Sequence, residues 1–345
     1  MDNSANQNNR LLELDSLRGI AAISVVLFHY TCKYNEIFES SLMNNIQFKL
    51  GHYGVQLFFI ISGFVIFLTI NKVSSSAEFI YKRFLRLFPT FWLCIVLTFT
   101  VTSFANIPRF ERTTSELLKN LTMMPSLLNA RAIDGVYWSL FPELLFYAFI
   151  LLIYKLKLIR NVQIVNCIWL ILSIIFVKFL FIKPIILLFN FQYSFLFTAG
   201  ISFYLLWTKN GNQKIHHFII LMSLVVCWLL KTTEEFMVTA VCFLIFYLFV
   251  NNFLSFLSKL KILTFLGNIS YSFYLIHQFI GLIIMYKLYE LGITNPYYLL
   301  IAPLIILILI SWIITKYFEV FVHNWFKKNV SLYDILSYRP RFFFK

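Results

Sequence analysis

The sequence has few charged residues and few residues that form turns. Only 13% of its 345 residues are charged, whereas 60% are hydrophobic, and this excludes an ordinary soluble protein and a disordered chain. Ten glycines and 8 prolines beside 41 phenylalanines and 19 tyrosines also exclude collagen-like and loop-dominated chains. Because so much apolar surface must leave water, we expect an integral membrane protein.

The five cysteines form no pattern that carries chemistry. The sequence contains neither a Cys-x-x-Cys pair nor the Cys/His spacing of a zinc site, and four of the cysteines lie within apolar stretches. We therefore expect no disulfide framework and no metal site. The cysteines are Cys32, Cys94, Cys167, Cys227 and Cys242.

Basic residues exceed acidic ones, with 29 Lys and Arg against 15 Asp and Glu and a net charge of +14. No soluble segment is long enough to form a basic domain, so we exclude nucleic acid as a partner. The basic residues occur in short runs between apolar stretches, which indicates membrane orientation. The polar start, MDNSANQNNR, and the charged residues that follow it are unlike a cleavable signal peptide.

Apolar stretches near the length of a membrane crossing, about 20 residues, recur along the chain. They predict an all-α integral membrane protein with about ten transmembrane helices in one bundle, of which the seventh and eighth are short enough to be a re-entrant pair instead. The predicted spans are 12–30, 51–70, 84–105, 137–154, 162–182, 185–207, 214–230, 236–250, 264–287 and 298–316.

The distribution of Lys and Arg predicts the orientation of the bundle. Most of them fall on the N-terminal side of the membrane, so we expect both termini in the cytoplasm. The segment Asn106–Val136 is then the longest one outside. We find no internal repeat, and expect one membrane domain over 11–325 between a polar tail, 1–10, and a basic cytoplasmic tail, 326–345.

The first predicted span carries three ionisable residues on one face. At 100° per residue, Asp15, Arg18 and His29 fall within about 60° of one another, and about 16 Å separates Arg18 from His29 along the axis. Ionisable residues at membrane depth usually mark function. The alternative is that Asp15 and Arg18 are anchors at the interface and that His29 reaches out of the membrane from the end of its helix.

Two arginines stand three residues apart at the start of the third span. Arg83 and Arg86 share one face of a helical turn. A pair of guanidinium groups at this spacing is suited to a phosphate. Simple positive-inside anchoring is the alternative.

Polar residues also interrupt the fourth and ninth spans. Glu143 in YWSLFPELLFY lies about one turn inside the outer boundary, where an unpaired carboxylate is costly. We expect it to pair with His29, which lies at the same depth. In NISYSFYLIH, hydrogen bonds between helices account for Tyr271, whereas His277 near mid-membrane is a further site candidate.

Taken together, these motifs resemble the acyltransferase 3 family of bacterial membrane proteins, from about Leu11 to Trp325. The family's Arg-x10-His signature is similar to Arg18 and His29, and its Arg-x-x-Arg motif to Arg83 and Arg86. Its second-helix block resembles GVQLFFIISGF, its Trp and Glu block resembles YWSLFPELLFY, and its ninth-helix block resembles NISYSFYLIH.

The resemblance implies an enzyme of the bacterial inner membrane, in the form without an SGNH domain. It implies transfer of an acyl group, usually acetyl, from a cytoplasmic acyl-CoA to a hydroxyl of a cell-surface glycan such as O-antigen, capsule or exopolysaccharide. The acceptor is then a surface polysaccharide or a lipid-linked glycan, and membrane lipids surround the protein. Acetyl-CoA is then a co-substrate, bound by Arg83, Arg86 and Arg18, and no cofactor is held permanently. His29 is expected to act as general base or to be acylated transiently, with Glu143 orienting it.

Two other classes of protein share some of these features. A glycan transporter or flippase also carries intramembrane Arg, His and Glu residues, although the missing repeat and the paired arginines count against it. A structural subunit of an export complex is the third alternative, and it predicts that His29 is replaceable.

Overall fold

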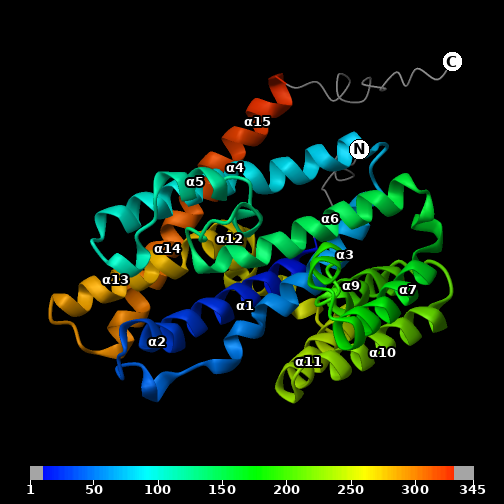
Figure 1. Cartoon of the computed structure of the whole chain (residues 1–345), viewed down its shortest axis with the longest axis horizontal. Helices are drawn as coiled ribbons and strands as arrows, with labels where there is room; N and C mark the ends of the chain where they lie inside the picture. Colours follow the sequence, from blue (N-terminus) through cyan, green and yellow to red (C-terminus); the bar gives the residue numbers. More distant parts are fainter. Residues whose placement is uncertain (1–10, 330–345) are drawn as a thin grey trace, which may run out of the picture.

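The computed structural model describes residues 11–329, and every regular element in that range is helical (Figure 1). The predicted tails 1–10 and 330–345 lie outside the described residues. The α-helices are α1 (Leu12–Phe28), α2 (Tyr34–Phe38), α3 (Gly54–Ile70), α4 (Ser76–Phe104), α5 (Thr114–Asn120), α6 (Leu140–Lys155), α7 (Val162–Ile174), α8 (Lys183–Leu188), α9 (Ser194–Trp207), α10 (Gln213–Leu230), α11 (Thr233–Val250), α12 (Lys261–Ile276), α13 (Gln278–Glu290), α14 (Pro296–Ile313) and α15 (Val320–Asn329).

Seven helices in the described range are long and apolar enough to cross a membrane, and eight if a bent pair counts as one crossing. This confirms the all-α membrane fold with fewer apolar spans than the ten predicted. Helices α10 and α11 each qualify alone. The ranges of α1, with 17 residues, and α9, with 14, do not qualify.

The predicted span 264–287 is not one straight helix. Helices α12 and α13 meet at His277 with a bend of 75°. Side chains from distant segments make hydrogen bonds with backbone groups at the bend. Asp134 Oδ2 accepts from Phe279 N at 2.9 Å, and Tyr30 donates its hydroxyl hydrogen to His277 O at 3.0 Å. Broken helices persist at membrane depth only where such partners exist. The predicted span is therefore bent at His277, and α12 and α13 together are still long and apolar enough to make one crossing.

The predicted span 185–207 is also divided, into the short helix α8 and the buried helix α9. Between them Asn190 adopts a left-handed conformation, with φ of 53°, and donates from its side-chain amide to Pro142 O at 3.0 Å. Helix α9 has 13 buried residues among its 14 and packs mainly against α3 and α10. It is therefore surrounded by protein, which explains how so short a helix is accommodated.

Helices α1 and α12 cross closely and share an extensive contact at the centre of the bundle (Figure 1). A Cβ atom at Gly267 would lie 1.7 Å from the backbone oxygen of Asp15, and one at Gly19 would lie 2.5 Å from Leu263 O. Small residues permit such close approach between membrane helices. The crossing places the polar residues of α1 beside those of α12.

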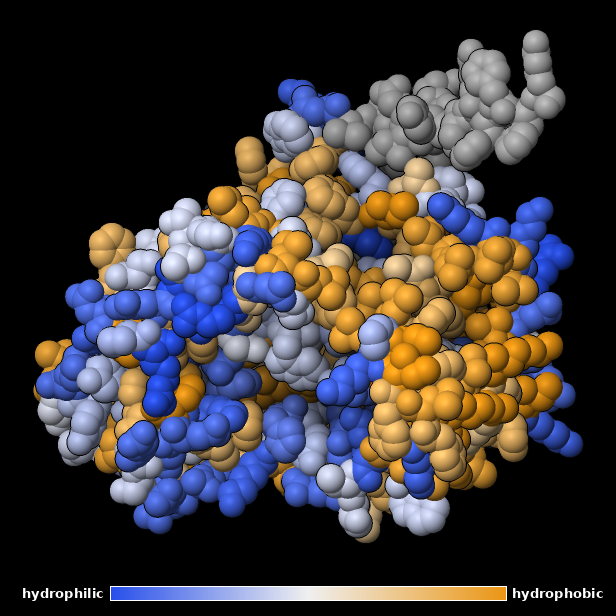
Figure 2. All heavy atoms as spheres, in the orientation of Figure 1, coloured by the Kyte–Doolittle hydropathy of each residue, from blue (hydrophilic) through white to orange (hydrophobic). Residues whose placement is uncertain are grey.

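Helices α7, α10 and α11 form an outer surface of the bundle that has the character of a lipid-facing surface. Figure 2 shows hydrophobic residues gathered over α7, α10 and α11, while hydrophilic residues gather over α2 and the loop after it. Isolated large apolar side chains are common on any surface, but a contiguous apolar face on adjacent long helices marks contact with lipid. The exposed side chains include Ile168, Ile171, Leu221, Val225, Trp228, Val241 and Leu244.

Candidate active site

A cavity of about 1220 Å³ lies inside the bundle, between α1, α3, α4, α6 and α12 and the segment that follows α14. On α3 its lining runs from Val55 to Leu68. These residues are thirteen positions apart, about 20 Å along a helix axis. The cavity therefore extends through much of the roughly 30 Å hydrocarbon core.

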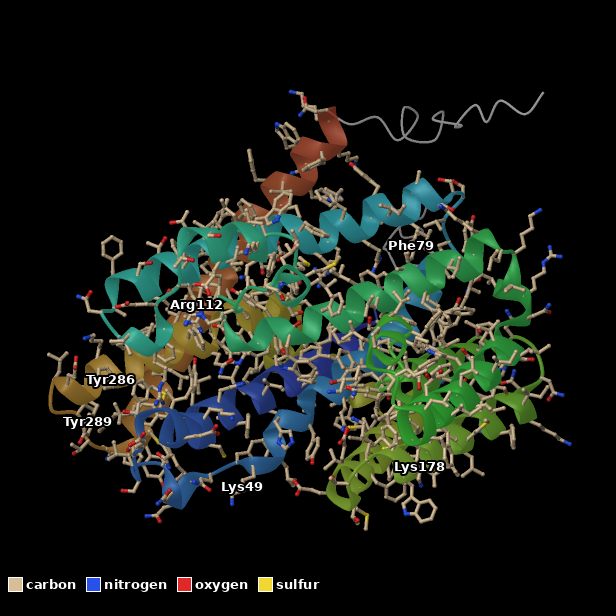
Figure 3. The ribbon with its side chains drawn as sticks, in the orientation of Figure 1. Lys49, Phe79, Arg112, Lys178, Tyr286 and Tyr289 are labelled. Carbon is tan, nitrogen blue, oxygen red and sulfur yellow. The ribbon has the colours of Figure 1, made fainter. Side chains whose placement is uncertain are left out.

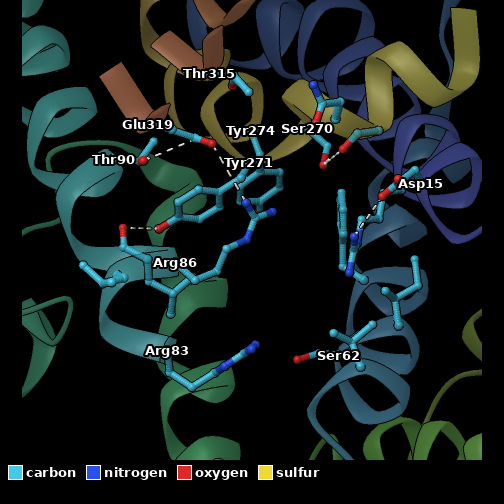
Figure 4. A pocket seen from close by; sticks show the side chains of 18 of the residues that line it. Asp15, Ser62, Arg83, Arg86, Thr90, Ser270, Tyr271, Tyr274, Thr315 and Glu319 are labelled. Atoms are coloured by element: carbon cyan, nitrogen blue, oxygen red, sulfur yellow. Dashed lines mark hydrogen bonds and ion pairs between the residues drawn. The ribbon is translucent and has the colours of Figure 1, made fainter. Parts of the chain in front are cut away.

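One end of the cavity carries the predicted arginine pair. Arg83 donates from Nη2 to Thr69 Oγ1 at 3.2 Å, and its buried Nε has no partner among the described residues. Arg86 lies 4.0 Å from the Glu319 carboxylate and 5.7 Å from the ring centre of Tyr271. Figure 4 shows both arginine side chains projecting into the cavity from α4. Their common face, as the i, i+3 spacing predicted, is directed at this space.

Tyr271 lines the same end of the cavity, and a hydrogen bond to α4 fixes its side chain. Its hydroxyl donates to Leu87 O on α4 at 2.9 Å, while its ring lies beneath the Arg86 guanidinium. The hydrogen bond between helices matches the expectation for this residue. Tyr271 therefore also holds the orientation of Arg86.

Asp15 and Arg18 contribute to the same cavity as an ion pair, with Arg18 Nη1 3.1 Å from Asp15 Oδ1. Further basic residues on the cavity wall were not predicted, because a local sequence pattern does not show which side chains of α4 and of the far C-terminal segment face the cavity. A π-helical turn, Ile314–Glu319, brings Thr315, Lys316 and Glu319 to the cavity together. The added basic side chains are Lys82, Lys316, His323 and Lys327.

Glu143 lines the middle of the cavity and does not pair with His29 as predicted. Its Oε1 accepts a hydrogen bond from Ser62 Oγ at 3.0 Å and another from the Tyr147 hydroxyl. Tyr147 follows Glu143 by one helical turn, so the carboxylate is satisfied within its own helix and by α3. The predicted partner was wrong because equal depth does not imply that two side chains face each other.

His29 instead contacts His277, at the bend between α12 and α13. The two atoms His29 Nδ1 and His277 Nε2 are 3.1 Å apart, and the ring centres are 4.9 Å apart. Both Nδ1 atoms also face carbonyl oxygens, of Val25 at 2.8 Å and of Tyr274 at 2.7 Å. A carbonyl oxygen only accepts, so each neutral ring carries its hydrogen on Nδ1. The Nε2 of His29 is therefore the unprotonated nitrogen.

The histidine pair lies just beyond one end of the cavity, opposite to the arginines. Gly54, next to the lining residue Val55, packs against Val25, one turn before His29. Tyr274 lines the cavity, and its ring centre is 5.5 Å from that of His277. A π-helical turn begins at His29, a feature that often occurs at functional sites. His29 is half-buried, whereas His277 is fully buried.

Asp134 is a residue of this region that the sequence analysis did not select. It is fully buried, and besides capping α13 through Phe279 it accepts from Val136 N at 3.1 Å. Burial raises the pKa of its carboxyl to about 7, against the lowering effect of the backbone hydrogen bonds and of Arg112. Figure 3 places Arg112 at the same end of the bundle as Tyr286 and Tyr289. A single aspartate in a predicted loop forms no sequence pattern from which its contact with α13 could have been predicted.

The described residues contain no group of three or more His, Cys, Asp and Glu side chains that could hold a metal ion. A cavity with a cationic end and a histidine pair, inside a bundle of membrane-spanning helices, defines a multi-pass membrane protein with an internal site. The chain matches the Acyltransferase domain of the acyltransferase 3 family over residues 11–316. It therefore belongs to that family of acyl-transfer enzymes.

A viral protein gives a second point of comparison. The chain is 27% identical over 289 residues to the protein named "Putative acetyltransferase ORF330" of Acidianus two-tailed virus, a match that covers 79% of this chain and 83% of the viral one. No solved structure gives a significant match. The family assignment thus rests on sequence, and the site geometry on this structure.

Proposed function

We propose that the protein transfers an acetyl group from cytoplasmic acetyl-CoA to a hydroxyl of a cell-surface glycan across a bacterial cytoplasmic membrane. Family membership supplies the acyl transfer. The acetyl-CoA donor, the glycan acceptor and the bacterial cytoplasmic membrane are what the resemblance to the family implies, and the distribution of charge along the cavity supports the position of the donor.

The arrangement of the cavity is the observation that supports this proposal best. CoA combines a nucleotide that carries several phosphates with a long, thin arm that ends in the thioester. Arg83, Arg86 and Arg18 line one end of the cavity, and guanidinium groups bind phosphates bidentately. The cavity then offers the arm a passage of about 20 Å towards the histidine pair.

His29 is the group that we assign to the chemical step. In direct transfer, Nε2 takes the proton of the acceptor hydroxyl while the hydroxyl oxygen attacks the thioester carbonyl, the C–S bond breaks, and the CoA thiolate leaves with the proton from Nε2. In the covalent route, the same lone pair attacks the carbonyl and breaks the C–S bond to expel CoA thiolate. The acceptor hydroxyl then attacks the acetyl group on His29, the N–C bond breaks, and the hydroxyl proton passes to the CoA thiolate. His277 positions the His29 ring in either route. The Nε2 of His277 accepts a hydrogen bond from Nδ1 of His29, so this contact leaves Nε2 of His29 available to the substrates.

Glu143 has a separate part in this proposal. It lies between the arginines and the outer end of the cavity, and is held by Ser62 and Tyr147. We assign it to the passage of the thioester arm rather than to the orientation of His29. Its replacement should therefore affect use of the donor.

The test uses purified protein in lipid nanodiscs with labelled acetyl-CoA and a surface glycan prepared from cells that lack this protein. Label should move to the glycan without any ion gradient, which a transporter would need. Replacement of His29 by alanine should abolish the transfer. Glycan that stays unlabelled, while the wild-type protein is folded and donor is present, would contradict the proposal.

A further inference from the structure

A group of aromatic rings lies at the end of the cavity opposite to the arginines. Phe59 lines the cavity, and its ring centre is 5.1 Å from that of Tyr193 and 6.4 Å from that of Trp138. The rings of Trp138 and Tyr193 are 6.0 Å apart at an angle of 36°. Three separate segments of the chain thus contribute to one aromatic surface that continues the cavity wall outward.

The indole of Trp138 is open to the surroundings, with 49% of the residue exposed. Phe59 beneath it is almost completely buried, and Tyr193 is half-buried. Packing therefore explains the inner part of this group but leaves the outermost ring uncovered. A large ring supported from below and free above is suited to stacking a ligand.

Polar side chains border the aromatic rings. Lys231 Nζ lies 5.1 Å from the ring centre of Tyr193 and 3.2 Å from Glu235 Oε1. The same carboxylate oxygen accepts from Gln56 Nε2 at 3.2 Å. These groups carry both donors and acceptors beside the rings, which is the usual composition of a site that fixes the orientation of a small ligand.

The charges beside the rings indicate which ligands fit. Glu234 and Glu235 stand together at the start of α11, and Lys231 is paired with Glu235. The border therefore has no excess of positive charge and offers nothing to balance a carboxylate or phosphate on the ligand. A neutral sugar ring suits it, because a pyranose presents C–H groups on one face and hydroxyls around its edge.

We propose that Trp138 and Tyr193, bordered by Lys231 and Glu235, bind a neutral hexopyranose unit of the acceptor. This inference rests on the proposed function, since it assumes that the acceptor is a glycan. The subsite lies beside the outer end of the cavity and at the opposite end from the donor arginines. It binds the sugar and takes no part in proton transfer.

The test measures binding and turnover separately. The variants are Trp138→Ala and the conservative Trp138→Phe, with Trp228→Ala as the matched control, because Trp228 is also exposed, at 63%, but lies on the lipid-facing helix α10. The binding probes are maltotriose, which is neutral, and trigalacturonic acid, which is anionic. Both are titrated into protein in phospholipid nanodiscs.

The expected result is weaker binding of maltotriose by Trp138→Ala, by about two- to twelve-fold, the factor that corresponds to one aromatic contact of about 0.5–1.5 kcal/mol. Trp138→Phe should lie between Trp138→Ala and wild type, and Trp228→Ala should equal wild type. Trigalacturonic acid should bind more weakly than maltotriose to the wild-type protein. In turnover with a neutral glycan, Trp138→Ala should raise the acceptor KM by a similar factor and leave the acetyl-CoA KM unchanged.

Each contrary result has a distinct meaning. Unchanged maltotriose binding in Trp138→Ala, or equal losses in Trp228→Ala, would overturn the sugar subsite and leave these residues as an interfacial aromatic belt. Preference for trigalacturonic acid would overturn its neutral character. Absence of acetyl transfer by the wild-type protein would refute the proposed function alone, because the binding titration still decides the subsite. If Trp138→Ala does not fold, the same comparisons apply to Trp138→Phe and Lys231→Gln.

Discussion

The two ends of the cavity differ in the forces that they offer a ligand. At one end guanidinium and ammonium groups converge from α1, α4 and the segment after α14, with Tyr271 and Glu319 holding Arg86. At the other end Phe59, Trp138 and Tyr193 form an aromatic surface, and Lys231 beside it is paired with Glu235. The first end suits a charged substrate, and the second suits a ligand bound by shape and hydrogen bonds.

Under the proposed function, this difference would let one bundle serve two dissimilar substrates without moving either through the membrane. The thioester arm of the donor would extend along the cavity to the histidine pair, and the acceptor would reach the same pair from the other side. The two recognition surfaces are then about a cavity length apart. Substitutions at the two ends should accordingly separate into effects on the donor, on the acceptor and on the chemical step.

The largest effect should come from His29, where we propose that both substrates meet. We expect His29→Ala to lower the rate of acetyl transfer by about 10²–10⁴-fold, the usual contribution of a general base, with near-normal abundance in the membrane. The measurement is initial rate with both substrates saturating. His217→Ala on α10, away from the cavity, is the control. A His29→Ala protein that keeps more than a tenth of the activity would remove His29 from the chemistry.

The next effect concerns the charged end alone. Lys at positions 83 and 86 keeps the charge but loses the planar fork of Arg. Since a hydrogen bond to a charged group contributes roughly 1.5–3 kcal/mol, we expect Arg83→Lys and Arg86→Lys each to raise the KM for acetyl-CoA about ten-fold or more. The KM for the acceptor should stay the same.

The matched control for the arginine pair is Arg160→Lys, in the 3₁₀-helical turn Leu158–Asn161 outside the cavity. Initial rates against acetyl-CoA concentration, at matched abundance, give the comparison for single and double variants. Unchanged donor saturation in the double variant would show that the pair only sets the membrane orientation.

A smaller effect, on stability, should come from Asp134 at the aromatic and histidine end. Its pKa of about 7 in the folded protein lies above the value near 3.8 of an unburied aspartate. The folded state therefore binds the proton more tightly, and its free energy of unfolding should fall as pH rises from about 4 to 7, by at most about 1.4 kcal/mol per pH unit. In Asp134→Asn this dependence should disappear, which thermal unfolding in detergent would show.

Glu116 provides the opposite case in the same extramembrane segment. Its hydrogen bonds with Arg131 and with the backbone of Thr113 lower its pKa to about 2. Its contribution to stability is thus present above about pH 4.5 and lost as pH falls towards 2. Glu116→Gln should change the profile only in that acidic range. If Glu116→Gln rather than Asp134→Asn changed the profile between pH 4 and 7, our assignment would be wrong.

The smallest effect on activity should come from cysteine variants for labelling. These variants show to which side of the membrane each end of the cavity opens. A cysteine at Ser115 should react with an impermeant thiol reagent in intact cells, whereas one at Asn329 should not, if the segment Asn106–Val136 is outside and the basic end is cytoplasmic. Both variants should retain normal transfer rates, because neither residue lines the cavity. Reversed labelling would place the donor end outside and contradict the cytoplasmic donor.

The fold class and the arginine pair were predictable because they depend on local patterns. Apolar runs identify membrane helices, and the i, i+3 spacing fixes the common face of Arg83 and Arg86. The sequence did not show that α9 is surrounded by protein or that α12 ends at His277, where no glycine or proline marks the bend. Apolarity does not distinguish lipid from protein as a neighbour, and the groups that stabilise the bend are far away in sequence.

The residues of the candidate site could be predicted from the sequence, but which of their side chains contact one another could not. Helical geometry placed Asp15, Arg18 and His29 on one face, but the partner of each depends on which helix lies opposite. His277 rather than Glu143 faces His29, because the close crossing at Gly267 brings α12 against α1. Lys316 and Lys327 reach the cavity only through the π-helical turn, which has no sequence signature that we could have used.

The bend at His277 also has a consequence for the order of biogenesis. As the chain emerges from the ribosome, Tyr30 and Asp134 are made long before α12 and α13, and these earlier segments supply side-chain hydrogen bonds to the backbone of the bend. Helices α12 and α13 therefore complete their insertion against helices that are already made, rather than as an independent hydrophobic unit. A nascent chain that lacked α1 or the segment before α6 would leave its last spans without a fixed register in the bilayer.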